Sequence, residues 1–303
     1  MDSTVKNILC PLCLESDKKF IRDYPGSFLK CKELYQCISC NLIYAVKIPN
    51  LKELDNYYSN GLYYDLDSNP FNEDIIEFSY NLALTRINLI QKKTNILIDK
   101  CRTLDIGAGN GMFGSALQVK CNQAIYDVIE PDLKVREKYG GQVNKQFSDI
   151  ADVIENDYDL IVMNQIMEHL VDPIEFIKSV CGLLKDEGII FIDVPFGDYI
   201  FKKSVVPHVL FWDIKSLSFL LKKSGLKLIF CDTVGMEHEK AKKYFKHKQV
   251  LEKIINPWLY ANKINLVMNK IGFPKPFKII KQFNAEKYGG DRMWLRCIAK
   301  KTI

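Results

Sequence analysis

The 303-residue sequence predicts an α/β fold built on a doubly wound sheet, preceded by a small metal-binding module. Three observations lead to this prediction. Short apolar runs alternate with helical periodicity over residues 102–234, a glycine-rich turn follows the first run, and two Cys-x-x-Cys pairs stand near the start. The composition agrees, because 48% of the residues are hydrophobic and 26% are charged, which is ordinary for a globular protein.

The cysteine pairs predict a structural metal site. They are separated by 23 residues and are formed by Cys10 with Cys13 and by Cys37 with Cys40. Two such pairs complete the closed tetrahedral shell of structural Zn²⁺, which leaves no position for a substrate. The expected ion therefore orders a module over residues 1–50 and takes no part in chemistry. Cys31 lies in the same segment without a Cys-x-x-Cys partner.

A connector is expected over residues 51–98. Its first part, residues 57–64, is rich in tyrosine and carries an Asn-Gly turn. From Phe71 to Gln91 the apolar residues recur at helical spacing, with Asn72 as a plausible N-terminal cap. The connector should therefore enter the core as a helix.

The core, residues 99–235, alternates strands and helices as a doubly wound sheet requires. Strands are expected at 102–106, 124–130, 144–147, 158–164, 188–194 and 226–234. Helices are expected at 111–119, from Asp132 onward, at 172–184 and at 213–223. Residues 236–291 break this rhythm with helical stretches and prolines, and residues 292–303 return as an alternating strand. A helical insertion, or lid, is therefore expected before the last strand.

The insertion is basic, although the net charge of the chain is only +5. Its first lysines cluster together and are Lys240, Lys242, Lys243, Lys246 and Lys248. Such a cluster favours an anionic partner such as phosphate or a membrane surface, and a solvated helix face is the alternative interpretation. His238 and His247 lie in the same stretch and are expected at the surface. No secretory signal and no run of about 18 apolar residues is present, so we expect a cytoplasmic protein.

The turn after the first core strand predicts a nucleoside site. Glycines at 107, 109 and 111 let a ligand approach the backbone, and the following helix offers free N–H groups. A nicotinamide fingerprint would need a third glycine where Met112 stands. Glu130 ends the next strand, where a carboxylate can accept both hydroxyls of a ribose. The turn and the acid together indicate a nucleoside at the carboxyl edge of the sheet.

Four stretches of the core carry a family resemblance. They are LDIGAGNG at 104–111, VIEPD at 128–132, SDI at 148–150 and YDLIVMNQIMEHLVDP at 158–173. In this order they resemble the motifs of the class I S-adenosylmethionine-dependent methyltransferases. The resemblance implies a Rossmann-like sheet of seven strands, the last antiparallel, and S-adenosylmethionine as cofactor. It implies these contacts: Asp105, Gly107 and Gly109 with the methionyl part, Glu130 with the ribose, Asp149 and Ile150 with the adenine, and Asn164 with the cofactor.

A narrower resemblance points to the acceptor. Two cysteine knuckles, a tyrosine-rich segment and the stretch 207–217, PHVLFWDIKSL, resemble zinc-binding methyltransferases of deoxysugar and surface-glycan biosynthesis. The chain lacks the large C-terminal domain of the longer sugar C-methyltransferases. The resemblance therefore implies O-methylation of a sugar, nucleotide-linked or part of a glycan, in polysaccharide or natural-product biosynthesis. We expect this small-molecule substrate to bear phosphate.

Three residues are candidates for catalysis. A sugar hydroxyl is a poor nucleophile until it is deprotonated, and histidine suits that task near neutral pH. His169 follows the strand 158–164 at the ligand-binding edge and is the expected general base. Glu168 is expected to orient it or to contact a substrate hydroxyl, and His208 is the second candidate. A histidine that only caps the next segment is the alternative interpretation.

Other functions stay open at this point. A zinc-ribbon RNA methyltransferase would use the basic insertion as a phosphate track, but the spacing of the cysteine pairs and the stretch around His208 fit the sugar-methyltransferase resemblance better, so nucleic acid is disfavoured. A sugar C-methyltransferase and a binding module without catalysis are weaker alternatives. Residues 254–280 mix tryptophan, aliphatic residues and lysine, so they are expected to form a lid or to contact a membrane peripherally. The sequence does not predict an oligomeric state.

Overall fold

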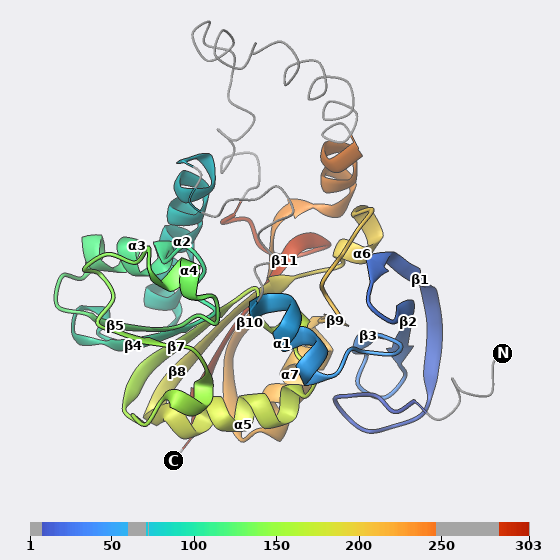
Figure 1. Cartoon of the computed structure of the whole chain (residues 1–303), viewed down its shortest axis with the longest axis horizontal. Coiled ribbons are helices and arrows are strands. Elements are labelled where there is room, and N and C mark those ends of the chain that lie inside the picture. The colour runs from blue at the N-terminus through green and yellow to red at the C-terminus, as the bar shows by residue number, and fades with distance from the viewer. Residues whose placement is uncertain (1–7, 60–70, 72, 247–284, 303) are drawn as a thin grey trace, which may run out of the picture.

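The computed structural model describes residues 8–59, 71, 73–246 and 285–302, which contain two sheets (Figure 1). The larger sheet contains β4 (Arg102–Ile106), β5 (Ile125–Ile129), β6 (Lys145–Phe147), β7 (Tyr158–Asn164), β8 (Leu184–Pro195), β10 (Leu226–Glu237) and β11 (Arg292–Lys301). Their order is β10-β11-β8-β7-β4-β5-β6. β11 is antiparallel to both neighbours, whereas β5, β4, β7 and β8 pair in parallel. This confirms the predicted seven-stranded, Rossmann-like sheet.

Helices cover both faces of the larger sheet. The helices of the described residues include α1 (Leu51–Ser59), α2 (Glu73–Lys93), α3 (Met112–Lys120), α4 (Leu133–Arg136), α5 (Pro173–Leu183), α6 (Asp198–Phe201) and α7 (Ile214–Lys223), and α2, α3, α5 and α7 pack on the sheet. Short 3-10 turns are η1 (Ile98–Lys100), η2 (Ile150–Asp152) and η3 (Met167–His169). Alternate residues of β7 face opposite sides, so Leu160 and Val162 pack with α2 and α3 while Ile161 and Met163 pack with α5 and α7. The apolar run of β7 is therefore buried on both faces.

The smaller sheet combines distant parts of the chain. It has the order β1 (Lys18–Phe28), β2 (Cys31–Cys37), β3 (Ile43–Ala45) and β9 (Leu210–Phe211). β9 pairs antiparallel with β3, and the amide of Ala45 donates to the carbonyl of Val209 at 2.8 Å. Figure 1 shows β9 beside β2 and β3. Residues 210–211 follow β8 along the chain of the core, and they also complete the smaller sheet.

A buried ion cluster ties α2 to the centre of the larger sheet. The carboxylate of Asp193 on β8 accepts hydrogen bonds from Nε of Arg86 at 2.8 Å and from Nε of Arg296 at 2.9 Å. All three residues are buried. Although burial opposes ionisation of Asp193, the two arginines hold its pKa below the usual value. Loss of the Asp193 carboxylate would leave two buried arginines without their shared partner, which would destabilise the fold.

His238 corrects an expectation. It is buried rather than at the surface, and its Nε2 lies 2.8 Å from the carbonyl of Phe196 and 2.7 Å from that of Arg292. Its ring stacks on Phe196, because the helix over residues 238–246 starts directly at the end of β10 and turns its first residue inward. In contrast, the lysines of this helix that are described are exposed.

Several expectations lie outside the described residues. These are the Asn72 cap, most of the tyrosine-rich segment, His247, Lys248 and residues 254–280. Within the described parts of the chain, no helix is both long enough and apolar enough to span a membrane.

Candidate active site

The carboxyl ends of three parallel strands meet at one edge of the larger sheet. Ile106 of β4 is in register with Ile129 of β5 and with Met163 of β7. The glycine loop, Glu130 and the segment 164–169 therefore leave the sheet side by side. A parallel sheet offers its ligand site at this edge, where the strand order reverses between β4 and β7.

The glycine loop has the backbone that only glycine adopts easily. Gly107, Gly109 and Gly111 have φ values of +70°, +56° and +71°. A Cβ on Gly107 would lie 2.0 Å from Cδ1 of Ile166, so this position is closed by packing. A Cβ on Gly109 would meet nothing within 4 Å. The space above Gly109 is thus open to a ligand.

Glu130 lies beneath the glycine loop. One carboxylate oxygen accepts the amide of Gly109 at 3.0 Å and the other accepts the amide of Asp132 at 3.1 Å. Burial raises the pKa of Glu130 to about 7, against the opposing effect of these two amides. Each oxygen keeps a second lone pair, so the carboxylate can accept two hydroxyls of a ribose.

Asp105 and Asn164 lie at this edge of the sheet, and each has one buried side-chain oxygen without a hydrogen-bond partner among the described residues. Asp105 accepts the hydroxyl of Tyr126 at 2.6 Å through one oxygen, and its other oxygen has no partner among the described residues. The side-chain oxygen of Asn164 also lacks a hydrogen-bond partner there. Burial raises the pKa of Asp105 to about 7. Buried polar atoms without partners are rare, and here they fit the amino group of a bound cofactor.

Asp149 and Ile150 follow β6 at the same edge. Asp149 is exposed and its carboxylate caps η2 by accepting the amide of Ala151 at 2.8 Å. Ile150 is half-buried beside it. The cap fixes the loop that would border an adenine, and the free oxygen of the carboxylate is still at the surface.

Glu168, His169 and His208 come together from two segments. One nitrogen of each histidine and one carboxylate oxygen of Glu168 lie within 4.8 Å of one another, and Nε2 of His169 is 3.8 Å from an oxygen of Glu168. The two imidazole rings meet edge to face with centroids 5.0 Å apart. Both oxygens of Glu168 are buried without a hydrogen-bond partner among the described residues. The structure therefore brings together the three candidates for catalysis.

Burial sets the protonation of this cluster. It raises the pKa of Glu168 well above the usual value, and the negative charge of Asp198 adds to the effect. It lowers the pKa of His169 well below the usual value, with His208 as the next cause. Burial thus favours the neutral form of both the carboxyl and the imidazole. One carboxyl and two imidazoles are not the oxygen-rich set that Mg²⁺ prefers.

Backbone contacts hold the segment that presents Glu168 and His169. Gln165 has a φ of +60°, and its amide donates to the carbonyl of Asp193 at 2.8 Å. The indole of Trp212 donates to the carbonyl of Met167 at 2.9 Å, and the amide of Val209 donates to the carbonyl of Glu168 at 2.8 Å. The segment around β9 therefore fixes η3 as well as carrying His208.

Asp198 belongs to the same cluster, although the sequence did not suggest it. Its carboxylate is buried and accepts Nδ1 of His208 at 2.9 Å and Nζ of Lys202 at 3.3 Å. The available signal was its place three residues after β8, at the same carboxyl edge as the other site residues. An acid in a loop at that edge is a site candidate even without a motif.

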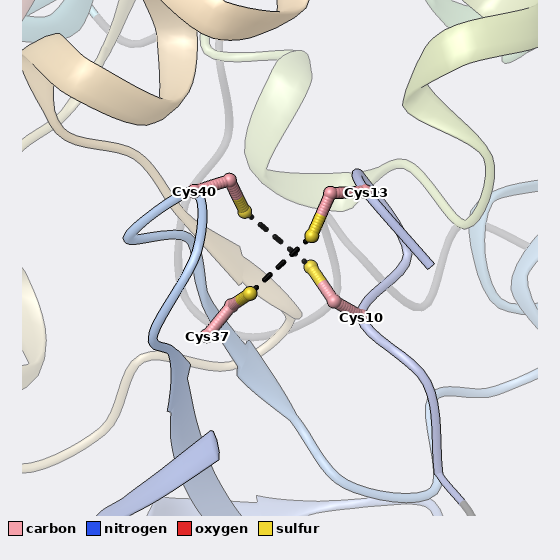
Figure 2. Close-up of side chains that lie close together, drawn as sticks. All are labelled: Cys10, Cys13, Cys37 and Cys40. Carbon is pink, nitrogen blue, oxygen red and sulfur yellow. Dashed lines mark hydrogen bonds between the residues drawn. The ribbon is translucent and has the colours of Figure 1, made fainter. Parts of the chain in front are cut away.

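The four cysteines of the two pairs come together, as a shared metal site would require. Figure 2 shows their thiols pointing toward a common centre. Sγ of Cys10 lies 3.5 Å from Sγ of Cys40, and Sγ of Cys13 lies 3.3 Å from Sγ of Cys37. These separations exclude disulfides and approach the roughly 3.8 Å between sulfurs of a tetrahedral zinc site. Cys31 lies apart, with its thiol 3.9 Å from the carbonyl of Lys47.

Comparison with known proteins agrees with the sheet and the glycine loop. Residues 81–230 match the family described as Methyltransferase domain. Together with the strand order and the site geometry, this match decides the family. Residues 81–230 are a class I S-adenosylmethionine-dependent methyltransferase domain. S-adenosylmethionine is the cofactor of this family, and the open space above Gly109 and the unsatisfied oxygens of Asp105 and Asn164 fit it.

Curated relatives of the methyltransferase domain are O-methyltransferases by name. The ubiquinone biosynthesis O-methyltransferase of Actinobacillus pleuropneumoniae is 30% identical over 118 residues, which cover 35% of this chain and 50% of that protein. The protein of the same name from Vibrio cholerae is 26% identical over 114 residues, covering 35% and 46%. The chain thus spans about half the length of the curated relatives that it matches.

Solved structures of methyltransferases resemble this chain at low identity. Phosphoethanolamine N-methyltransferase 2 of Haemonchus contortus has a TM-score of 0.48 and 14% identity, covering 86% of this chain and 62% of that one. A methyltransferase from Leishmania major has a TM-score of 0.46 and 18% identity, covering 75% and 74%.

Proposed function

We propose that this protein transfers a methyl group from S-adenosylmethionine to a hydroxyl of a small-molecule acceptor. The observation that carries the proposal is the cluster of Glu168, His169 and His208 at the sheet edge that also holds the glycine loop. The cofactor supplies an activated methyl group on a sulfonium. The protein's own tasks are therefore to align the acceptor and to remove its proton.

His169 is the proposed proton acceptor, with His208 beside it. Burial keeps the imidazole of His169 neutral near pH 7, as a base must be before it acts. Glu168 is proposed to hold a neighbouring hydroxyl of the acceptor, because its two oxygens are buried and have no hydrogen-bond partner among the described residues. An acceptor with several hydroxyls would satisfy these groups.

The proposed acceptor is a phosphate-bearing sugar, nucleotide-linked or part of a glycan. The polar, hydroxyl-binding character of the cluster and the front module support this class. A polyhydroxylated aromatic ring is the second candidate. It is supported by the names of the curated relatives, which are ubiquinone biosynthesis O-methyltransferases and match only part of their own length.

Transfer of labelled methyl groups tests the proposal. Wild-type protein is incubated with labelled S-adenosylmethionine and either a panel of nucleotide sugars or a polyhydroxybenzene. His169→Gln should lose turnover by about 100-fold or more while cofactor affinity stays intact. His238→Gln is the matched control, because this buried histidine lies outside the cluster. Near-normal turnover of His169→Gln would remove His169 as the base.

RNA is the contrasting acceptor. Lys240, Lys242, Lys243 and Lys246 are exposed along one helix and would serve such a function. Filter binding with structured RNA should show weak affinity at physiological salt, whereas an RNA methyltransferase predicts tight binding that falls steeply as salt rises. Tight, salt-sensitive binding would replace the small-molecule proposal.

For the front module we propose a structural zinc ion bound by Cys10, Cys13, Cys37 and Cys40. The convergence of four thiols in a tetrahedral arrangement supports this ion. All four positions of the shell come from protein, so the ion would stabilise the module without touching the acceptor. Metal analysis of the purified protein should find one zinc per chain.

A further inference from the structure

Asp198 stands behind His208 in a position that no part of the proposed reaction has used. It lies in α6, and its side chain is 1% exposed. One oxygen accepts from His208 Nδ1 at 2.9 Å and from Lys202 Nζ at 3.3 Å. The buried carboxylate therefore contacts Nδ1 of the second histidine of the cluster.

This contact determines which nitrogen of His208 carries the proton. Although burial opposes ionisation, Lys202 and His208 lower the pKa of Asp198 to about 2, so near neutral pH its oxygens only accept hydrogen bonds. The hydrogen bond at 2.9 Å then requires a proton on Nδ1 of His208. A neutral imidazole carries a single N–H, so Nε2 of His208 is left as a proton acceptor.

The surroundings of the two histidines also differ in how well they tolerate a positive charge. His169 is deeply buried and has His208 as its neighbour, and both effects disfavour its imidazolium form. The groups facing His208 are the ring of His169, Glu168 and the carboxylate of Asp198, which is shared with Lys202. The ring of His208 is in direct contact with the carboxylate of Asp198, with Nδ1 2.9 Å from the carboxylate oxygen.

We propose that Asp198 is a positioning residue for proton removal: it keeps Nε2 of His208 unprotonated, so that the proton taken by His169 comes to rest on His208. This inference rests on the proposed hydroxyl acceptor. The acceptor O–H bond breaks and an O–CH3 bond forms while the S–CH3 bond breaks. The positive charge of the sulfonium ends as an imidazolium beside Asp198, with no oxidation or reduction.

Nitrogen NMR of the full-length protein tests the positioning without any acceptor. The chain has four histidines, and His208→Gln identifies the signals of His208. Wild-type protein should show His208 protonated on Nδ1. In Asp198→Asn, Lys202 engages the amide oxygen and the amide N–H faces the ring, so the proton should move to Nε2. An unchanged tautomer in Asp198→Asn, or an Nε2–H form in wild type, would overturn the proposal.

Kinetics test the consequence for proton removal. Asp198→Asn should lower kcat by about 100-fold, with KM and cofactor affinity within about twofold of wild type, because the ring can no longer accept the proton. Its activity should recover as pH rises, since hydroxide then takes the proton. Lys203→Met removes the neighbouring exposed lysine and leaves both Asp198 and Lys202 in place, so it is the matched control, with kcat within about threefold. Wild-type kcat and pH profile in Asp198→Asn would refute the proposal. If wild type methylates no hydroxyl, the proposed function fails, and the tautomer measurement still decides the role of Asp198.

Discussion

The front module, residues 8–50, and the methyltransferase core share one hydrophobic cluster, but four converging thiols occur in the front module. The core buries apolar residues on both faces of a seven-stranded sheet, and its helices lie over these faces. The front module is a few short strands with four thiols converging at one end. A unit of about 40 residues buries too little surface to fold without help from a metal or from its neighbours. The four thiols thus add a candidate metal site to a module that also packs on the core.

The two regions nevertheless share one strand. β9 belongs to the chain of the core, pairs with β3 of the front module and is followed immediately by Trp212, which holds η3. The hydroxyl of Tyr24 on β1 donates to the carbonyl of His208 at 2.8 Å. The front module therefore supports the segment that carries His208, whereas the glycine loop and Glu130 belong to the core alone.

Removal of the metal shell is expected to have the largest effect. The double substitution Cys37→Ser and Cys40→Ser should abolish zinc binding, with an apparent loss of about 10 kcal/mol for the folded module. β9 and His208 then lose their partner strand, so methyl transfer should disappear while S-adenosylmethionine still binds. Metal analysis, hydrogen exchange and calorimetry measure the three quantities. Cys31→Ser, outside the shell, should change none of them by much.

If the double substitution also abolishes cofactor binding, the front module and the core do not fold independently. The core would then depend on the front module for its own folding. Protection of β4 and β5 in hydrogen exchange distinguishes this outcome from a local loss of β9.

The buried ion cluster of the core should show the next largest effect. Asp193→Ala leaves Arg86 and Arg296 without their shared carboxylate, and we expect a loss of about 3–5 kcal/mol in the free energy of unfolding. Urea denaturation measures the loss. Asp186→Ala is the control, because Asp186 is exposed and lies 3.8 Å from Lys301, where an ion pair contributes about 1 kcal/mol or less. Equal losses in the two variants would show that Asp193 is not the centre of a stabilising ion cluster.

The cofactor edge should make the core sensitive to pH. Burial raises the pKa of Glu130 to about 7, so the folded state holds a proton there that the unfolded state releases near pH 4.5. The contribution of Glu130 to the free energy of unfolding is fully present below pH 4.5. It is lost as pH rises through 7, and the total loss is about 3 kcal/mol. Asp105 acts in the same direction. Urea denaturation of wild type and Glu130→Gln between pH 5.5 and 8 measures the share of Glu130.

Cofactor binding should show the opposite pH dependence. The ionised carboxylate accepts ribose hydroxyls more strongly than the protonated form, so S-adenosylmethionine should bind more tightly as pH rises through 7. Calorimetry across this range checks the prediction, and Glu130→Gln should flatten it. An affinity that falls with pH would show that Glu130 binds as a neutral acid.

The smallest expected effect concerns the bridge between the two regions. Tyr24→Phe removes the hydrogen bond to the His208 carbonyl and should lower stability by about 1 kcal/mol and kcat by a few-fold, with cofactor affinity unchanged. Tyr35→Phe is the matched control, since its hydroxyl contacts Glu33 within the front module at 3.3 Å. A fall in kcat for Tyr35→Phe equal to that for Tyr24→Phe would show that the bridge has no specific role.

The regular elements of the core could be predicted because their signals are local. The apolar run of β7 and the turn at Gly107–Gly111 each lie within a few consecutive residues, and the structure has both. The partners of the site residues could not be predicted in this way. Asp193 meets Arg86 across 107 positions of the chain, and β9 is too short to carry a periodic pattern. His238 was assigned to the surface because its neighbours are lysines, whereas its own side chain turns inward.

The sequence by itself predicted a doubly wound sheet of seven strands through its motifs, a nucleoside site through the glycines and Glu130, and a metal site through the cysteine spacing. Each of these depends on residues close together in the chain or on a repeated pattern. Only the tertiary structure decided that the front sheet takes β9 from the core, that Asp198 holds His208, and that burial sets the protonation of Glu168 and His169. The physical reason is that burial and long-range hydrogen bonds depend on which surfaces meet after folding.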